Sequence, residues 1–331
     1  MHAKEAVGTT AGKKAPGRIN LKDPNMIMLI AGIVFVIILA IVVPKFLSVR
    51  NISNIFVTAS TTGLMAIGLT FVMITSGIDL SCPTVMALSA ICGASVMLNT
   101  GSVLLGVLVI LAVGLLFGVI NGLSVAKLRM VPMIVTLAVS TVASGISNWY
   151  TGARSLSGMP ELYSDLFSSK LFGVIPVQAV ILVAVTVIMH IVLTKTVFGR
   201  SVFAVGVNEK AARVNGVKTG RIIFFAYMIA GGLYGLAGVV AGARSNAAGP
   251  SLGQQSMFMD IVCAVVLGGT SVSGGKGSIV GTFVGCLFMS VISNVMNLMN
   301  VEYFVTYVIK GAIIVLVTYF DVIRNRSQES R

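Results

Sequence analysis

The hydrophobic residues form long apolar runs separated by short polar connections, and this arrangement recurs from residue 26 to residue 320. Because an α-helix rises about 1.5 Å per residue, roughly 20 apolar residues cross the hydrocarbon core of a bilayer. The runs lack the period-two alternation of transmembrane strands. The pattern therefore predicts an all-α, polytopic membrane protein with about ten transmembrane helices. The predicted helices cover residues 26–46, 54–75, 84–98, 103–126, 133–150, 176–193, 222–243, 257–267, 279–294 and 303–320.

Composition and charge agree with a membrane protein and predict its orientation. The mean hydropathy is +1.00 and only 10% of the residues are charged, which lies outside the range of soluble globular proteins. With the N-terminus in the cytoplasm, five of the 23 Lys and Arg residues fall outside and one lies within the last run, which leaves 17 on the cytoplasmic side. This positive-inside distribution predicts that both termini are cytoplasmic. It also explains the net charge of +13 without a nucleic-acid partner.

The predicted domain organisation is a transmembrane domain between two short tails. Residues 1–25 are basic and precede an apolar run that is too long for the core of a signal peptide, so we expect a retained cytoplasmic tail. Residues 26–320 form the transmembrane domain, and residues 321–331 form a second cytoplasmic tail. The four cysteines show no Cys-x-x-Cys spacing and no nearby histidine pair, so we predict no metal, cofactor or disulfide framework.

Two of the apolar runs, residues 84–98 and 257–267, are short for a full crossing, and each has an aspartate nearby, Asp79 and Asp260. Transporters place short, interrupted helices beside a cavity, and a carboxylate at membrane depth is costly without a role. The alternative is that each aspartate caps a helix start at the interface. The two short runs also raise the possibility that helices two to five repeat as helices seven to ten with inverted topology.

The chain is expected to break just before the first short run. Pro83 lacks an amide hydrogen and disfavours a helical conformation at Cys82. We expect the Asp79 carboxylate to accept hydrogen bonds from the free amides of this break. Asp79, Ser81 and Asp260 are accordingly the predicted residues of a translocation pathway.

Residues 198–221 form one long polar insert between two apolar runs, on the predicted cytoplasmic side. Within it, Asn208-Glu-Lys-Ala-Ala212 indicates a helix start, because Glu209 favours the helix dipole. Ala211 and Ala212 leave a small surface for the groove of a partner, and Gly216 follows this helix. The alternative is an ordinary solvated loop. The glycine-rich run from Gly269 to Ser278 departs from the phosphate-binding pattern in spacing and predicts a tight turn.

Several motifs together resemble the permeases of ATP-binding-cassette importers of the ribose, xylose and galactose type. These motifs are Gly77-Ile-Asp-Leu-Ser81, Phe198-Gly-Arg-Ser-Val-Phe-Ala-Val-Gly206, Asn208-Glu-Lys-Ala-Ala212 and Val266-Leu-Gly-Gly-Thr-Ser-Val-Ser-Gly-Gly-Lys-Gly277. The resemblance implies the ten-helix permease fold of the vitamin B12 importer class and a coupling helix in the insert. The chain departs from the family pattern at Cys82-Pro83, Phe258 and Ser144, which leaves the solute open.

The leading hypothesis is a permease subunit in the bacterial plasma membrane that imports a small polar solute, with a monosaccharide favoured. The resemblance implies three partners: an ATPase subunit that hydrolyses the ATP, a second permease, and an extracytoplasmic solute-binding protein. We predict that the outward Arg50, Arg154 and Arg244 contribute to docking of the binding protein. The alternatives are the same machinery for branched-chain amino acids, nucleosides or a furanose signal, and an ion-coupled secondary transporter that uses the two aspartates. A membrane enzyme is disfavoured because no nucleophile, base or metal constellation appears.

Overall fold

The computed structural model describes residues 39–302, 305–306, 308–312 and 315. The chain divides into two units, residues 1–44 and residues 45–331, and each is described by itself. In the first unit, residues 39–42 are helical, and most of the predicted helix 26–46 lies outside the described residues. Both predicted tails, residues 1–25 and 321–331, lie outside them as well.

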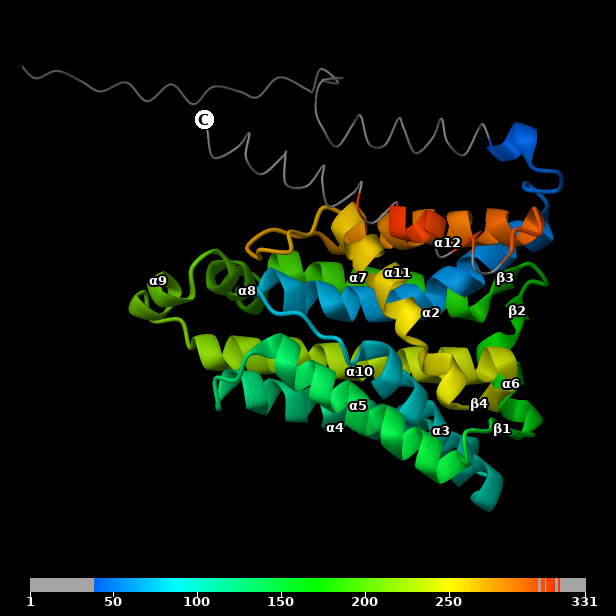
Figure 1. Cartoon of the computed structure of the whole chain (residues 1–331), viewed down its shortest axis with the longest axis horizontal. Helices are drawn as coiled ribbons and strands as arrows, with labels where there is room; N and C mark the ends of the chain where they lie inside the picture. Colours follow the sequence, from blue (N-terminus) through cyan, green and yellow to red (C-terminus); the bar gives the residue numbers. More distant parts are fainter. Residues whose placement is uncertain (1–38, 303–304, 307, 313–314, 316–331) are drawn as a thin grey trace, which may run out of the picture. The chain divides into compact units, whose positions relative to one another are not determined.

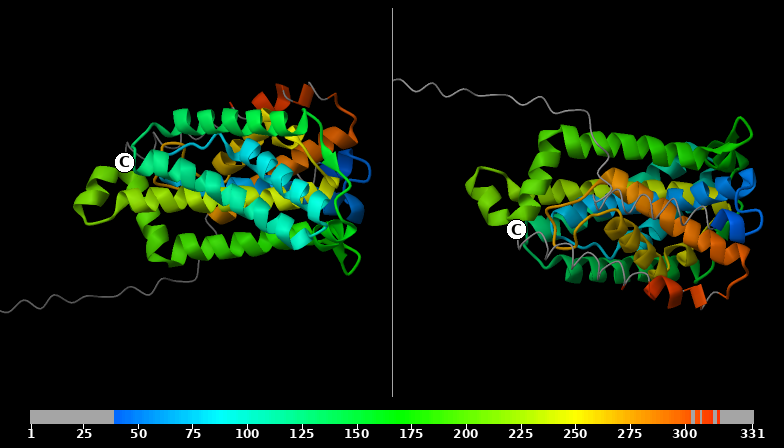
Figure 2. Two further views of the ribbon diagram at one scale, coloured as in Figure 1. Left: turned by 90° about the horizontal axis from the view of Figure 1, so that it is seen from below. Right: turned by 90° about the horizontal axis from the view of Figure 1, so that it is seen from above.

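The described part of the second unit is almost entirely helical (Figures 1 and 2). Its helices are α2 (Val49–Ile74), α3 (Cys82–Thr100), α4 (Val103–Ala126), α5 (Pro132–Thr151), α6 (Glu161–Ser168), α7 (Val177–Lys195), α8 (Val197–Val207), α9 (Glu209–Val214), α10 (Thr219–Ser245), the 3-10 helix η1 (Pro250–Gly253), α11 (Gln255–Leu267) and α12 (Ile279–Leu298).

Four two-residue strands form two small antiparallel pairs. β1 (Leu156–Ser157) pairs with β4 (Ala247–Ala248), and β2 (Lys170–Leu171) pairs with β3 (Ile175–Pro176). In Figure 1 these strands and α6 lie at one end of α10, which we call the strand end, and α9 lies at the other, which we call the α9 end.

Among the described residues, six helices are long and apolar enough to cross a membrane: α2, α3, α4, α7, α10 and α12. The expectation of a short helix at residues 84–98 is therefore wrong, because α3 extends over 19 residues. Pro83 lies in the first turn, where a missing amide hydrogen breaks no helical hydrogen bond. The other run expected to be short, α11, has 13 residues.

Close contacts between helices occur where glycines lie at the interface. A methyl group on Gly118 of α4 would lie 2.9 Å from the Cα of Gly231 in α10, and one on Gly122 would lie 2.9 Å from the carbonyl oxygen of Phe224. The same holds for α12 against α11, since a methyl group on Gly285 would lie 2.1 Å from the carbonyl oxygen of Ala264. Backbones approach this closely in membrane helices only where side chains are absent.

Burial separates a central helix from peripheral ones. α2 is buried over most of its length, and its Leu64, Met65 and Phe71 are inaccessible. On α4, by contrast, Leu104 is 70% exposed. Large apolar side chains exposed along such long helices are compatible with lipid rather than water as the surrounding solvent.

Candidate functional site

The segment of residues 75–81, which joins α2 to α3, is the break that the sequence predicts. Its backbone leaves the helical path, yet its polar groups find partners inside the protein. The Leu80 amide donates to the Thr136 hydroxyl of α5 at 3.1 Å, and the same hydroxyl lies 3.2 Å from the carbonyl oxygen of Ile78. The Gly77 amide donates to the carbonyl oxygen of Val72 at 3.1 Å. Non-helical backbone is therefore stabilised between apolar helices.

Asp79 lies at the centre of this segment and is only 1% exposed. One carboxylate oxygen accepts hydrogen bonds from the Ser81 amide at 2.9 Å and the Ser81 hydroxyl at 2.5 Å. The other accepts one from the Tyr234 hydroxyl of α10 at 3.2 Å. The side-chain amide of Asn121 in α4 donates to the Ser81 hydroxyl at 2.9 Å. The expected hydrogen bond from a backbone amide before α3 is confirmed, and the network also connects the segment to α4 and α10.

The other end of the same segment contacts the residues that precede α9. The Ser76 hydroxyl lies 3.2 Å from the carbonyl oxygen of Gly206 and 3.0 Å from that of Ser273, in the glycine-rich turn. A methyl group on Gly206 would lie 1.7 Å from the carbonyl oxygen of Ile74, the last residue of α2. Only glycine permits this approach. The end of α8 is thus packed directly against the break in the chain.

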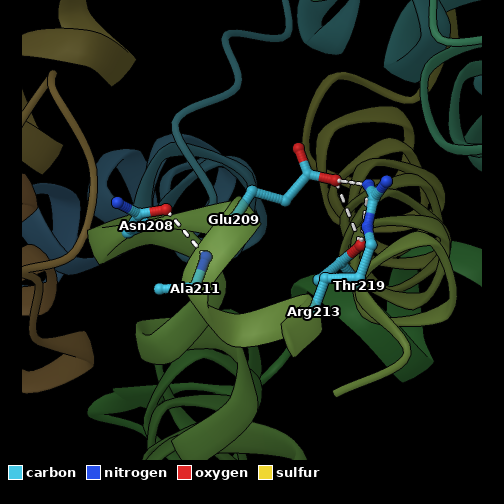
Figure 3. Close-up of polar contacts among 5 residues, drawn as sticks. All are labelled: Asn208, Glu209, Ala211, Arg213 and Thr219. Atoms are coloured by element: carbon cyan, nitrogen blue, oxygen red, sulfur yellow. Dashed lines mark hydrogen bonds and ion pairs between the residues drawn. The ribbon is translucent and has the colours of Figure 1, made fainter. Parts of the chain in front are cut away.

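The polar insert folds into α8, α9 and a turn that leads into α10 (Figure 3). The Asn208 side chain caps α9 by accepting a hydrogen bond from the Ala211 amide at 2.9 Å. The Glu209 carboxylate forms an ion pair with Arg213 and accepts a hydrogen bond from the Thr219 hydroxyl at 3.0 Å. These contacts hold α9 against the start of α10, so the insert is an ordered element.

The predicted partner surface on α9 needs one correction. Ala211 is exposed, but Ala212 is buried at 5% exposure, because it faces the rest of the protein. Gly216 has a φ of +83°, a left-handed conformation that glycine adopts without strain, and a methyl group on it would meet open space. The small outward surface therefore consists of Ala211, next to the glycine turn.

Asp260 lies in a separate polar cluster. It is the sixth residue of α11, and its carboxylate forms an ion pair with the Lys310 ammonium at 2.7 Å. The two side chains are 22% and 16% exposed, and residues 308–312 are helical. Within the described residues, the partners of Asp79 are Ser81 and Tyr234 and the partner of Asp260 is Lys310, so the two aspartates of the predicted pathway do not form one site. Neither is the N-cap of its helix, since those positions belong to Ser81 and Gln254.

The sequence alone did not identify Thr136, Asn121 and Tyr234 as partners of the interrupted segment. Each is a polar group within a long apolar run, which is the signal that could have selected them. The structure also shows polar groups on the outer face of α5, where Thr141 and Asn148 are exposed and Gly145 has no neighbour within 4 Å. The Thr141 hydroxyl and the Asn148 side-chain amide donate to carbonyl oxygens of their own helix, those of Leu137 and Ser144.

The three outward arginines are exposed near the strand end. Arg154 comes shortly before β1, Arg244 lies in the last turn of α10 before β4, and these two strands pair. Arg50 lies in the first turn of α2, whose beginning is close to β3. Their role in docking stays a prediction.

The long apolar helices define a polytopic helical membrane protein. Comparison of sequences makes the assignment specific: the chain belongs to the family described as the permease component of the branched-chain amino acid transport system, which matches residues 51–318. No solved structure matches the chain.

The chain also matches curated relatives over most of its own length and most of theirs. The ribose import permease protein of Bacillus subtilis (strain 168) is 39% identical over 87% of this chain and 89% of that protein. The galactose/methyl galactoside import permease protein of Escherichia coli (strain K12) is 32% identical over 87% of this chain and 92% of that protein. The L-arabinose ABC transporter permease protein of Azospirillum brasilense is 32% identical over 91% of this chain and 89% of that protein.

Proposed function

We propose that this chain is the permease subunit of an ATP-binding-cassette importer that carries a monosaccharide across the bacterial plasma membrane. The relatives named for ribose, galactose and arabinose support the solute class. In this proposal the fold is the ten-helix permease of the vitamin B12 importer class and both termini are cytoplasmic. ATP is hydrolysed on a partner ATPase, and a second permease and an extracytoplasmic binding protein complete the importer.

One observation carries the mechanism: the ordered insert is packed directly against the break between α2 and α3. Gly206 touches the carbonyl oxygen of Ile74, and Ser76 reaches Gly206 and the glycine-rich turn. A partner that moves α9 would therefore displace the end of α8 and the segment of residues 75–81. We infer that α9 is the coupling helix, with Asn208, Glu209, Ala211 and Gly216 at the contact and Ala212 as its internal support.

The polar groups on the outer face of α5 fit an uncharged, hydroxyl-rich solute. Thr141 and Asn148 on the outer face of α5 are uncharged groups that donate to carbonyl oxygens of their own helix, which leaves their oxygens as acceptors, and Ser144 lies between them on the same helix. We place the translocation pathway along this face, shared with the second permease. Asp79 and Ser81 support it from behind by holding the interrupted segment, and Asp260 fixes α11 through Lys310.

A branched-chain amino acid is the second candidate, because the family description names that class of solute. The ion-coupled transporter is less well supported. Among the described residues both oxygens of Asp79 accept hydrogen bonds, and the charge of Asp260 is balanced by Lys310, which leaves one buried Asp260 oxygen without a hydrogen-bond partner.

The test is uptake by the reconstituted importer, using labelled ribose, galactose, arabinose and leucine with the ion gradient collapsed. We expect ATP-dependent uptake of one of the sugars. Glu209→Lys should abolish uptake while the protein stays in the membrane, because it breaks the contacts of α9 with Arg213 and Thr219. Gly216→Trp should do the same, since it forces a bulky residue into a left-handed conformation. Lys195→Glu, exposed on α7, is the matched control.

Normal uptake by both α9 variants, with the ATPase still copurifying, would remove the coupling assignment. Uptake that requires an ion gradient rather than ATP would replace the importer by a secondary transporter. Uptake of leucine alone would select the amino-acid alternative.

A further inference from the structure

A cleft of about 950 Å³ opens beside α9, and Glu209 and Gly216 of the proposed coupling contact form part of its lining. Its walls come from α9, the turn of residues 216–218, the start of α10, and the connection between α4 and α5. Residues 75–77 of the interrupted segment also line it. The cleft thus lies where several transmembrane helices end.

The lining of this cleft carries an excess of positive charge. It contains five cations, Arg129, Lys210, Arg213, Lys218 and Arg221, and a single carboxylate, Glu209. That carboxylate is already occupied by Arg213 and Thr219. Within the described residues, the other four cations have no carboxylate partner. Unpaired cations gathered around a hollow attract an anion.

An apolar surface continues from the same cleft. The connection that supplies Arg129 also exposes Leu128 at 66%, Met130 at 47% and Val131 at 58%, and Met130 lines the cleft itself. The first turn of α5 continues this surface with Met133 at 50% and Ile134 at 65% exposure. Cations and exposed apolar side chains are therefore contiguous along residues 128–134.

We propose that this cleft binds the headgroup of an anionic phospholipid, with its phosphate near Arg129, Lys218 and Arg221 and its acyl chains along Met133 and Ile134. Basic pockets between transmembrane helices at the cytoplasmic face bind such headgroups. A free phosphate would leave the apolar surface unused, and an acidic protein segment would not need it. The proposal rests on the proposed function only for the cytoplasmic position of the cleft.

Because the cleft lies beside α9, lipid binding there would influence the position of this helix. The headgroup would lie against Lys210 on α9 and reduce the repulsion among the cations that surround this helix. Binding would then favour the position of α9 seen here, and anything that moves α9 would weaken lipid binding in return.

The test uses the full-length permease in a non-ionic detergent, without ATPase or ATP, titrated with fluorescent phosphatidylglycerol or phosphatidylcholine. We expect preferential binding of phosphatidylglycerol. Arg129→Gln/Arg221→Gln should weaken it by about 30-fold, because each Lys or Arg near an anionic lipid contributes roughly fivefold. The control is Lys195→Gln/Arg200→Gln, which removes two exposed cations that do not line the cleft. Its affinity for phosphatidylglycerol should fall by less than about threefold, because these cations are not beside the headgroup.

Lys218→Gln is the second cleft variant. The Lys218 side chain is exposed and makes no capping hydrogen bond, so its replacement should not disturb folding. The affinity for phosphatidylglycerol should fall about fivefold. Three results would overturn the proposal: no preference for the anionic lipid, an equal loss in the control pair, or competition by soluble glycerol phosphate as strong as that of the lipid. A separate purification from cells that also produce the ATPase tests the other occupant: loss of copurifying ATPase from the cleft variants, with lipid binding intact, would assign the cleft to that protein instead. Because no transport is measured, failure here leaves the coupling assignment untouched.

Discussion

The two aspartates that mark the short apolar runs look alike in the sequence but are neutralised in different ways. Asp79 lies in non-helical backbone, and within the described part of the chain its carboxylate accepts hydrogen bonds from uncharged donors, which Ser81 and Tyr234 supply. Asp260 lies inside a helix, and its partner is the ammonium of Lys310. The first arrangement distributes one charge over several dipoles, and the second cancels it with an opposite charge.

The difference shows what each carboxylate holds in place. The Asp79 network connects α3, α4 and α10 around a break in the chain, and the same segment contacts α8 through Ser76. The Asp260 pair connects only α11 and the helical residues around Lys310. Substitutions in the first region should therefore affect both folding and coupling, whereas substitutions in the second should affect folding alone.

The largest effect is expected at Asp79. Asp79→Leu leaves the Ser81 amide, the Ser81 hydroxyl and the Tyr234 hydroxyl without an acceptor, and each unsatisfied buried donor costs about 1–3 kcal/mol. We expect little protein in the membrane and no uptake. Asp79→Asn keeps one acceptor oxygen and should retain part of the uptake. Quantified membrane protein and initial uptake rates measure both, and wild-type values for the two variants would mean that the network is dispensable.

Alanine substitutions at Gly206 and Gly285 distinguish an effect on folding from an effect on coupling. Gly206→Ala places a methyl 1.7 Å from the carbonyl oxygen of Ile74, and Gly285→Ala places one 2.1 Å from that of Ala264. Both should lower the amount of protein. In the molecules that fold, only Gly206→Ala should lose stimulation of ATPase activity by the solute, since only Gly206 belongs to the insert.

Gly232→Ala is the control for this pair, because its methyl would come no closer than 3.8 Å to Leu115, and it should behave like the wild type. Loss of ATPase stimulation in Gly285→Ala as well would erase the distinction between the two regions.

The fold could be predicted where one helix is uniformly apolar and long. Residues 103–126 are confirmed at both ends, since Ser102 caps the helix and Lys127 follows it. The start of α3 was missed, because a proline in the first turn resembles a helix break in the sequence. The contacts of Asp79 with Tyr234 and of Asp260 with Lys310 join residues 155 and 50 positions apart, and no local pattern encodes such pairings. The helix start at Asn208 was predicted and is confirmed by α9. The inward position of Ala212 was not, because it depends on packing.

The ion pair gives a smaller effect than Asp79. Removing one member leaves a lone charge, whereas removing both leaves none. We expect Asp260→Asn and Lys310→Gln each to lower the amount of membrane protein roughly two- to fivefold, because both side chains are partly exposed and the charge is partly solvated. The double variant should recover most of the loss. A double variant worse than either single one would show that the two residues act independently.

The smallest effect on the protein itself is expected at the strand end, where the charges are exposed and their action is on a partner. Arg50→Ala/Arg154→Ala/Arg244→Ala should leave the amount of membrane protein unchanged, since exposed charges contribute little to folding. It should slow association with the binding protein several-fold at low salt, and the difference should fade above about 0.1 M salt, where the screening length is roughly 10 Å. Lys195→Ala/Arg200→Ala, in helices outside the strand end, is the control. Association rates that are the same for the triple variant and the wild type at every salt concentration would place the docking surface elsewhere. Charge would then have a demonstrated role only at the buried aspartates, where it acts on folding, and not at the exposed arginines.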